Sequence, residues 1–154
     1  MACCGAISSF FYILETSAFM NYAVPLRYFI VMTVMLLLTG LWMFTLHTSL
    51  SIDGTMNYYS PKSFYGLLET VNPHLFGMGL LVFILTHFFA VLKGVEQKKY
   101  RLLSVLFFVV MLVANLSGFF ITEGGVFLSV VKLLSTLLFI GFILVTSYKL
   151  FKIT

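Results

Sequence analysis

Four stretches of the chain are apolar over the length that a membrane-spanning helix needs. They cover residues 28–48, 73–92, 102–122 and 126–148. A helix requires about 20 mostly apolar residues to cross the hydrocarbon core of a bilayer. None of the stretches alternates between apolar and polar residues as a barrel strand does, and helices satisfy their own backbone groups in lipid. The pattern predicts an all-α integral membrane protein with a four-helix up-down-up-down transmembrane bundle.

Basic residues gather on one side of this arrangement. The connection at 93–101, between the second and third stretches, holds four of them. Arg27 precedes the first stretch, and two lysines close the fourth. Because basic residues flank membrane helices mainly on the cytoplasmic side, we expect both termini in the cytoplasm. The segment 49–72 and the short turn at 123–125 then lie outside.

The first 26 residues are expected to form a segment of their own. Residues 7–20 are apolar but include Glu15, and Pro25 separates them from the first span. The connection is too short to reverse direction, so we expect an interfacial helix on the cytoplasmic side. The chain then divides into an N-terminal interfacial segment, 1–26, and a four-helix transmembrane domain, 27–154.

Turn and helix-start signals mark the outer segment between the first two spans. Asp53 and Gly54 predict a turn, and a short helix is expected at about 62–70. Asn72 followed by Pro73 is typical of a helix start, with Asn as the N-cap and Pro at the first helical position. The second span is therefore expected to begin at Pro73.

The composition excludes most soluble classes of protein. Hydrophobic residues make up 61% of the 154 residues and charged residues 9%, whereas soluble domains carry about 25% charged residues. The two cysteines, Cys3 and Cys4, are adjacent, which excludes a disulfide scaffold. Despite a net charge of +4, the basic residues form no face for nucleic acid. We expect an integral protein of a bacterial inner (plasma) membrane, surrounded by the lipid bilayer.

A few polar residues lie inside the predicted spans at one common depth. Ionisable side chains are costly in a bilayer and are therefore candidates for function. His47 ends the first span and His74 opens the second. Lys132 lies about six residues into the fourth span, about 9 Å below the outer surface, and Asn115 lies about as deep in the third.

Two neutral imidazoles from facing helices can bind haem iron from both sides. We therefore predict that His47 and His74 hold a haem b. Lys132 would pair with a haem propionate, and Asn115 or a backbone carbonyl would orient one imidazole through its other nitrogen. The predicted function is a small membrane b-type cytochrome, or the haem-bearing membrane subunit of a respiratory electron-transfer complex.

Such a protein needs partners for its electrons. We expect electrons to pass between a quinone in the bilayer and a partner at the outer side. Glu69 or Tyr59 would handle protons near the quinone, and Tyr59, like Tyr58, also suits the interfacial aromatic belt. We also expect other membrane or peripheral subunits as partners, and the chain could form a homo-oligomer.

His87 is a weaker candidate for the metal. It lies 13 positions beyond His74, hence about 20 Å deeper, with its ring turned about 140° around the helix. A second haem would need Met35 or Met111 as the other ligand, since no other histidine lies at that depth. We do not predict a second haem.

Other readings of these residues remain open. Each histidine taken alone also fits a solvated or capping role, and Lys132 could extend its ammonium to the outer headgroups. The alternative function is a cofactor-free accessory or scaffolding subunit. An oligomeric channel around Lys132 that favours anions ranks below both. Whether the chain is a membrane subunit of an oxidoreductase stays open. An enzyme that acts on a lipid or thiol is not favoured, because no nucleophile stands beside a base.

Overall fold

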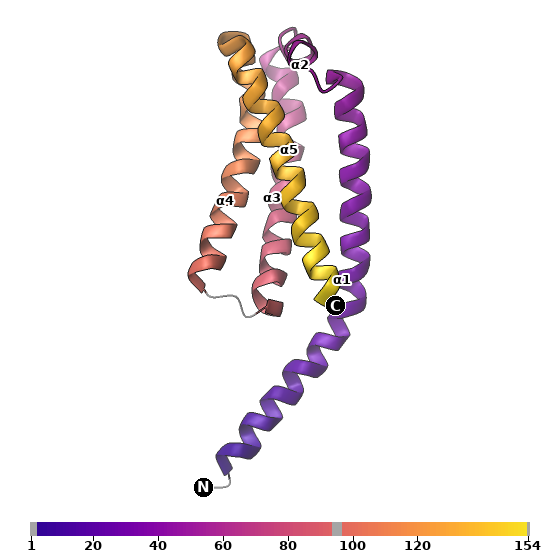
Figure 1. Ribbon diagram of the computed structural model, residues 1–154, viewed down its shortest axis with the longest axis vertical. Helices are drawn as coiled ribbons and strands as arrows, with labels where there is room; N and C mark the ends of the chain where they lie inside the picture. Colours follow the sequence, from indigo (N-terminus) through magenta and orange to yellow (C-terminus); the bar gives the residue numbers. More distant parts are fainter. Residues whose placement is uncertain (1–2, 94–96, 154) are drawn as a thin grey trace.

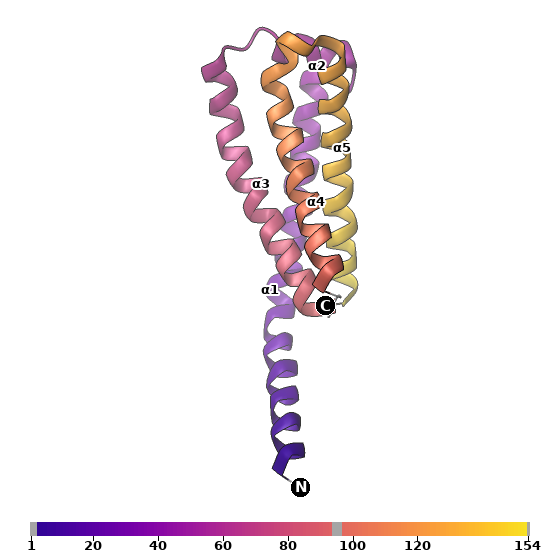
Figure 2. The ribbon, with the colours of Figure 1, turned by 90° about the vertical axis from the view of Figure 1, so that its left-hand side faces the viewer.

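The computed structural model describes residues 3–93 and 97–153, and this part of the chain is all helical. Four long helices lie side by side, and a short helix, α2, lies at one end of them (Figures 1 and 2). The elements are α1 (Cys3–Thr48), α2 (Ile52–Tyr59), α3 (Phe64–Lys93), α4 (Gln97–Leu116), the 3-10 turn η1 (Ser117–Phe120) and α5 (Ile121–Ile153). The all-α prediction is confirmed.

Three segments are long and apolar enough to cross a membrane: Tyr22–Thr48, Phe64–Ala90 and Arg101–Lys152. The last, of 52 residues, contains most of α4 and of α5, which run in opposite directions in Figure 1. Only 17%, 22% and 28% of the most apolar window of these segments is buried, so most of their apolar surface faces outward. Exposed apolar surface on this scale requires a lipid environment. The protein is an integral membrane protein.

Helix α1 runs without interruption through Pro25 and includes the N-terminal segment. Its first part extends away from the other helices, and the helix bends where it leaves them (Figure 1). A proline inside a helix costs one backbone hydrogen bond and bends the helix, but it need not end it. The separate helix expected at 7–20 is therefore continuous with the first span.

Helix α3 also passes through a proline. It begins at Phe64, where the Ser63 hydroxyl accepts a hydrogen bond from the Gly66 N–H at 3.2 Å, and it continues through Pro73. The predicted helix start at Asn72 is therefore wrong. Membrane helices tolerate proline because nearby groups and small backbone adjustments satisfy the freed carbonyl. The short helix and the second span are one element.

The predicted turn at Asp53 and Gly54 is instead the first turn of α2. Ser51 is the N-cap, and its hydroxyl accepts a hydrogen bond from the Gly54 N–H at 2.9 Å. Asp53 lies in the first turn, where a negative charge favours the helix dipole. The predicted turn at this position is wrong: the chain turns earlier, at Ser49 and Leu50, which have positive φ.

Replacing Ser51 with alanine should lower the free energy of unfolding by about 1 kcal/mol, because the first turn of α2 loses its capping acceptor. Thermal unfolding in detergent, followed by circular dichroism, measures the change. Ser60→Ala is the matched control, since Ser60 lies exposed at the other end of α2. Equal melting temperatures for Ser51→Ala and the wild type would show that the cap is not stabilising.

The hydrophobic core lies between the long helices. Helix α5 packs against α1, α3 and α4, whereas α1 packs mainly against α2 and α5. The core side chains are Leu26, Ile30, Leu37, Val82, Leu85, Phe89, Phe107, Met111, Phe139, Ile143 and Leu150. Helix α3 tilts away from the others at its N-terminal end (Figure 2). This tilt leaves space between α1 and α3.

Candidate functional site

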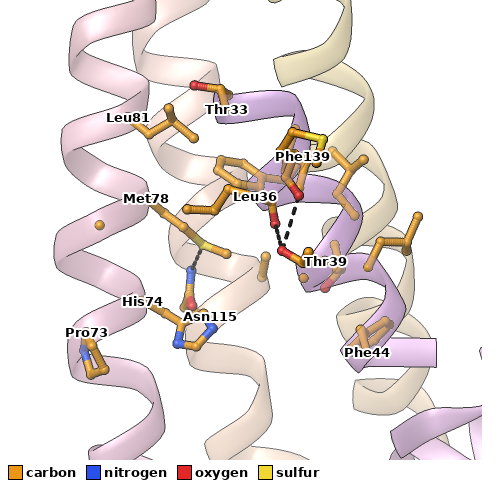
Figure 3. Close-up of a pocket in the computed structure, with 18 of the residues that line it drawn as sticks. Thr33, Leu36, Thr39, Phe44, Pro73, His74, Met78, Leu81, Asn115 and Phe139 are labelled. Carbon is orange, nitrogen blue, oxygen red and sulfur yellow. Dashed lines mark hydrogen bonds between the residues drawn. The ribbon is translucent and has the colours of Figure 1, made fainter. Parts of the chain in front are cut away.

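A groove of about 730 Å³ lies between α1 and α3, and we call it the lateral groove. Its lining comes from residues 29–44 of α1, 73–81 of α3, 114–115 of α4 and 132–140 of α5 (Figure 3). Most of the lining is apolar. The polar lining residues are Thr33, Thr39, His74, Asn115, Lys132 and Thr136. Such a volume, with a few polar groups in an apolar wall, is typical of a small-molecule site.

A second cavity, of about 500 Å³, adjoins this groove, and we call it the histidine pocket. It is lined by Leu36, Thr39, Gly40, Met43, Phe44, His47, Tyr58, Thr70 and His74. His47 comes from α1 and His74 from α3, and both side chains are exposed. The structure therefore places these two imidazoles at one pocket. His74 lines the lateral groove as well.

The imidazole of His74 is held by its own helix. Its Nδ1 lies 2.7 Å from the Thr70 carbonyl oxygen, which can only accept a hydrogen bond. Nδ1 therefore carries the proton and donates it, and Nε2 of the neutral ring keeps its lone pair. A histidine that binds a metal commonly donates its other N–H to a backbone carbonyl in this way. The backbone carbonyl of Thr70, not Asn115, orients this ring.

The imidazole of His47 is held by a ring contact. It stacks on Tyr58 of α2 with centroids 4.8 Å apart and an angle of 10° between the planes. The Lys62 ammonium lies 3.8 Å from the centroid of the same tyrosine ring. Stacking uses the face of the imidazole, so the ring nitrogens at its edge stay available to a ligand.

The side chain of Lys132 is enclosed by neighbouring helices. It is buried with 8% of its surface exposed, and its ammonium donates a hydrogen bond to the carbonyl of Ala114 on α4. The ring of Tyr59 lies beneath it, 5.1 Å from Nζ to the centroid. Among the side chains that the structure describes, those of residues 22–90 and 101–152, no carboxylate forms an ion pair with it. Lys132 is a buried cation without a neutralising charge in this part of the chain.

Asn115 joins two helices. Its side-chain amide donates to the Met111 carbonyl at 2.8 Å and to the sulfur of Met78 at 3.3 Å, which ties α4 to α3 (Figure 3). Asn115 and Lys132 line the lateral groove and not the histidine pocket. The four residues predicted at one depth are thus divided between two adjoining cavities that share His74.

Comparison with known proteins assigns the chain to a family. Residues 53–153 match a family described as a transmembrane helical domain, Aq_1264_TM. The chain belongs to the Aq_1264_TM family. No curated protein and no solved structure matches the chain. The Aq_1264_TM domain begins in α2, so it includes His74, Asn115 and Lys132, whereas His47 precedes it.

His87, although part of the Aq_1264_TM domain, lies apart from both cavities. Its exposed ring packs against Phe83, with centroids 6.1 Å apart, and against Phe88, at 6.0 Å. In the described ranges, no three His, Cys, Asp or Glu side chains gather as a metal cage. The ligand set considered for a metal is therefore the pair His47 and His74, which line one pocket.

Sequence reasoning missed the environment of Tyr59, in the first helix of the Aq_1264_TM domain. A Cβ at Gly118 would lie 3.1 Å from Cε1 of this ring, so the absent side chain admits the tyrosine. Burial, and then the neighbouring charge of Tyr58, raises the pKa of Tyr59 to about 12. Tyr59 is consequently a neutral phenol at physiological pH. Only the fold of α2 and η1 reveals this contact, because no local motif encodes it.

Proposed function

We propose that the chain is a small membrane b-type cytochrome, or the haem-bearing membrane subunit of a respiratory electron-transfer complex. One observation carries the proposal: the imidazoles of His47 and His74, from two different helices, line one pocket of about 500 Å³. Cofactor pockets commonly measure about 300–1,000 Å³. Two histidines from facing helices are a common way to hold haem in a helical bundle.

The residues of the histidine pocket fit this group. The hydrogen bond from His74 Nδ1 to the Thr70 carbonyl leaves Nε2 as the ring nitrogen that would bind the iron. The apolar walls include Leu36, Met43 and Phe44, which suit a porphyrin ring. A Cβ added at Gly40 would meet nothing within 4 Å, so this wall leaves space beside the backbone. The donor set and the shape both support haem.

Haem, when bound, supplies a centre for one-electron transfer. The chain would hold the iron with the imidazoles of His47 and His74 and would exclude water with the apolar walls of the histidine pocket. A pairing of Lys132 with a haem propionate stays a prediction. Lys132 lines the adjoining lateral groove, which shares His74 and four residues of α1 with the histidine pocket.

The proposal includes a topology with four crossings and both termini in the cytoplasm, in a bacterial inner membrane. Helix α4 contains 20 residues. Helix α5 contains 33 residues and has a kink with non-helical backbone angles at Gly125, beyond which it is still long enough for one crossing. Basic residues in the 93–101 connection and at the end of α5 support the placement of these ends of the helices in the cytoplasm. Electrons would then pass between a quinone in the bilayer and an outer partner, with the first part of α1 at the inner interface.

Labelling of single cysteines tests this topology. In a chain with Cys3 and Cys4 replaced by alanine, Ser60→Cys should react with an impermeant maleimide in intact cells. Lys152→Cys should react only after the membrane is permeabilised, because positive residues stay inside. The opposite pattern would invert the topology, and labelling of both in intact cells would place the C-terminus outside.

The absorption spectrum of the purified full chain tests the proposed function. Protein from a haem-replete host should show a Soret band that shifts on reduction with dithionite, and the pyridine haemochrome should be that of haem b. A helical, monodisperse protein without a Soret band would refute the proposal.

The alternative is a cofactor-free accessory subunit. It is favoured by the stacking of His47 on Tyr58, which already gives one of the two imidazoles a partner in the chain. Co-purification with a larger membrane partner, without any chromophore in this chain, would select this alternative.

A further inference from the structure

We propose that the lateral groove binds a long-chain fatty acid, with the carboxylate at the ammonium of Lys132 and the alkyl chain between α1, α3 and α5. This inference goes beyond the proposed function and does not depend on it. The lateral groove shares five lining residues with the histidine pocket, but Lys132 lines the lateral groove alone. A carboxylate at Lys132 would take the place that the haem hypothesis gives to a propionate, and this ligand absorbs no visible light.

The charge of Lys132 supplies the first argument. A buried ammonium is costly unless an opposite charge neutralises it. Lys132 is 8% exposed, and its protein contacts are the carbonyl of Ala114 and the ring of Tyr59. Both stabilise a cation, yet neither carries a negative charge, since the phenol of Tyr59 is neutral. An ammonium has three donors, so it can bind an anion as well as the carbonyl.

The shape of the groove supplies the second argument. From Lys132 the lining of α5 continues to Ile140, eight residues further, which corresponds to about 12 Å along the helix. On α1 the lining extends from Phe29 to Phe44, about 22 Å. The wall along this course is mainly apolar, with Met32, Leu36, Leu37, Leu81, Phe139 and Ile140. A charged group at one place in a long apolar groove matches a carboxylate with a single alkyl chain.

Two glycines show where a side chain would compete with this ligand. A Cβ at Gly77 meets no atom within 4 Å, and Gly77 lines the lateral groove but not the histidine pocket. Gly141 is equally unobstructed, but it lines neither cavity. Leucine at Gly77 should therefore enter the alkyl-chain site without disturbing the fold, and leucine at Gly141 is the matched control.

Equilibrium binding of radiolabelled palmitate to the purified full chain in nanodiscs tests the inference. Palmitate should bind saturably, and hexadecanol, which lacks the charge, about ten- to a hundredfold more weakly. Lys132→Gln should weaken palmitate binding by a similar factor, whereas Lys149→Gln, at an exposed lysine, should leave it unchanged. Gly77→Leu should weaken binding, and Gly141→Leu should not.

Equal binding of palmitate and hexadecanol would overturn the inference, as would unchanged palmitate binding by Lys132→Gln. If Lys132→Gln instead loses haem and keeps palmitate, Lys132 belongs to the haem site and the inference is wrong. If this variant does not fold, two other comparisons test the inference. One compares palmitate with hexadecanol on the wild-type protein, and the other compares Gly77→Leu with Gly141→Leu. Since palmitate binding is measured without a haem signal, a colourless protein that binds palmitate would refute only the proposed function.

Discussion

Replacing His74 with alanine should remove the haem from the purified protein, and His47→Ala should do the same. Each change deletes one of the two imidazoles that line the histidine pocket. Loss of a group that merely orients a metal ligand already weakens metal binding about 10- to 100-fold, so loss of a ligand itself should cost at least as much. The ratio of haem to protein, from the pyridine haemochrome, should therefore fall at least about tenfold.

His87→Ala is the matched control for this pair. His87 packs against Phe83 and Phe88 and lines neither cavity. Its haem content should equal that of the wild type. If His87→Ala loses the haem while His47→Ala keeps it, the iron lies on the other half of α3 and the assignment of the histidine pocket is wrong.

Gly54→Ala should destabilise α2 and the adjoining end of α1. A Cβ at this position would overlap the backbone carbonyl oxygen of Thr48, which cannot move without displacing the end of α1. Overpacking of this kind typically costs about 1–3 kcal/mol, and backbone can relax less than a side chain. Because α2 carries Tyr58 and Tyr59, its displacement should also separate Tyr58 from His47 and reduce haem content.

Thermal unfolding in detergent measures this effect, with Gly141→Ala as the control. A Cβ at Gly141 meets nothing within 4 Å, and alanine favours a helix by about 1 kcal/mol over glycine. Gly141→Ala should therefore melt at or above the wild-type temperature. A Gly54→Ala protein that melts with the wild type would mean that α2 does not pack against the end of α1 as described.

The helical class and the membrane location could be predicted from the sequence, because both depend on composition and on the length of apolar stretches. The common level of His47 and His74 could also be estimated by counting helical rise. The start of α3 could not, since Asn72 and Pro73 favour a helix start locally while the surrounding apolar segment continues the helix through them. In lipid an unbroken helix satisfies more backbone groups than a break would.

The partners of Lys132 could not be predicted either. Its depth follows from the sequence, but its direction depends on how α5 packs against α4. In the structure, the Lys132 ammonium donates a hydrogen bond to the Ala114 carbonyl and contacts the ring of Tyr59. The sequence leaves a haem propionate and the outer headgroups as its expected partners. The contact between Tyr59 and Gly118 likewise joins residues that are far apart in the chain, and no local pattern indicates it.

Electron paramagnetic resonance of the oxidised, purified full chain tests the central claim most directly, because the spectrum of ferric haem reports its axial ligands. Iron held by His47 and His74 should give the low-spin signal of two imidazoles, and this signal should disappear in His74→Ala. A high-spin ferric signal in the wild type, or a bis-imidazole signal that persists in His74→Ala, would contradict the account.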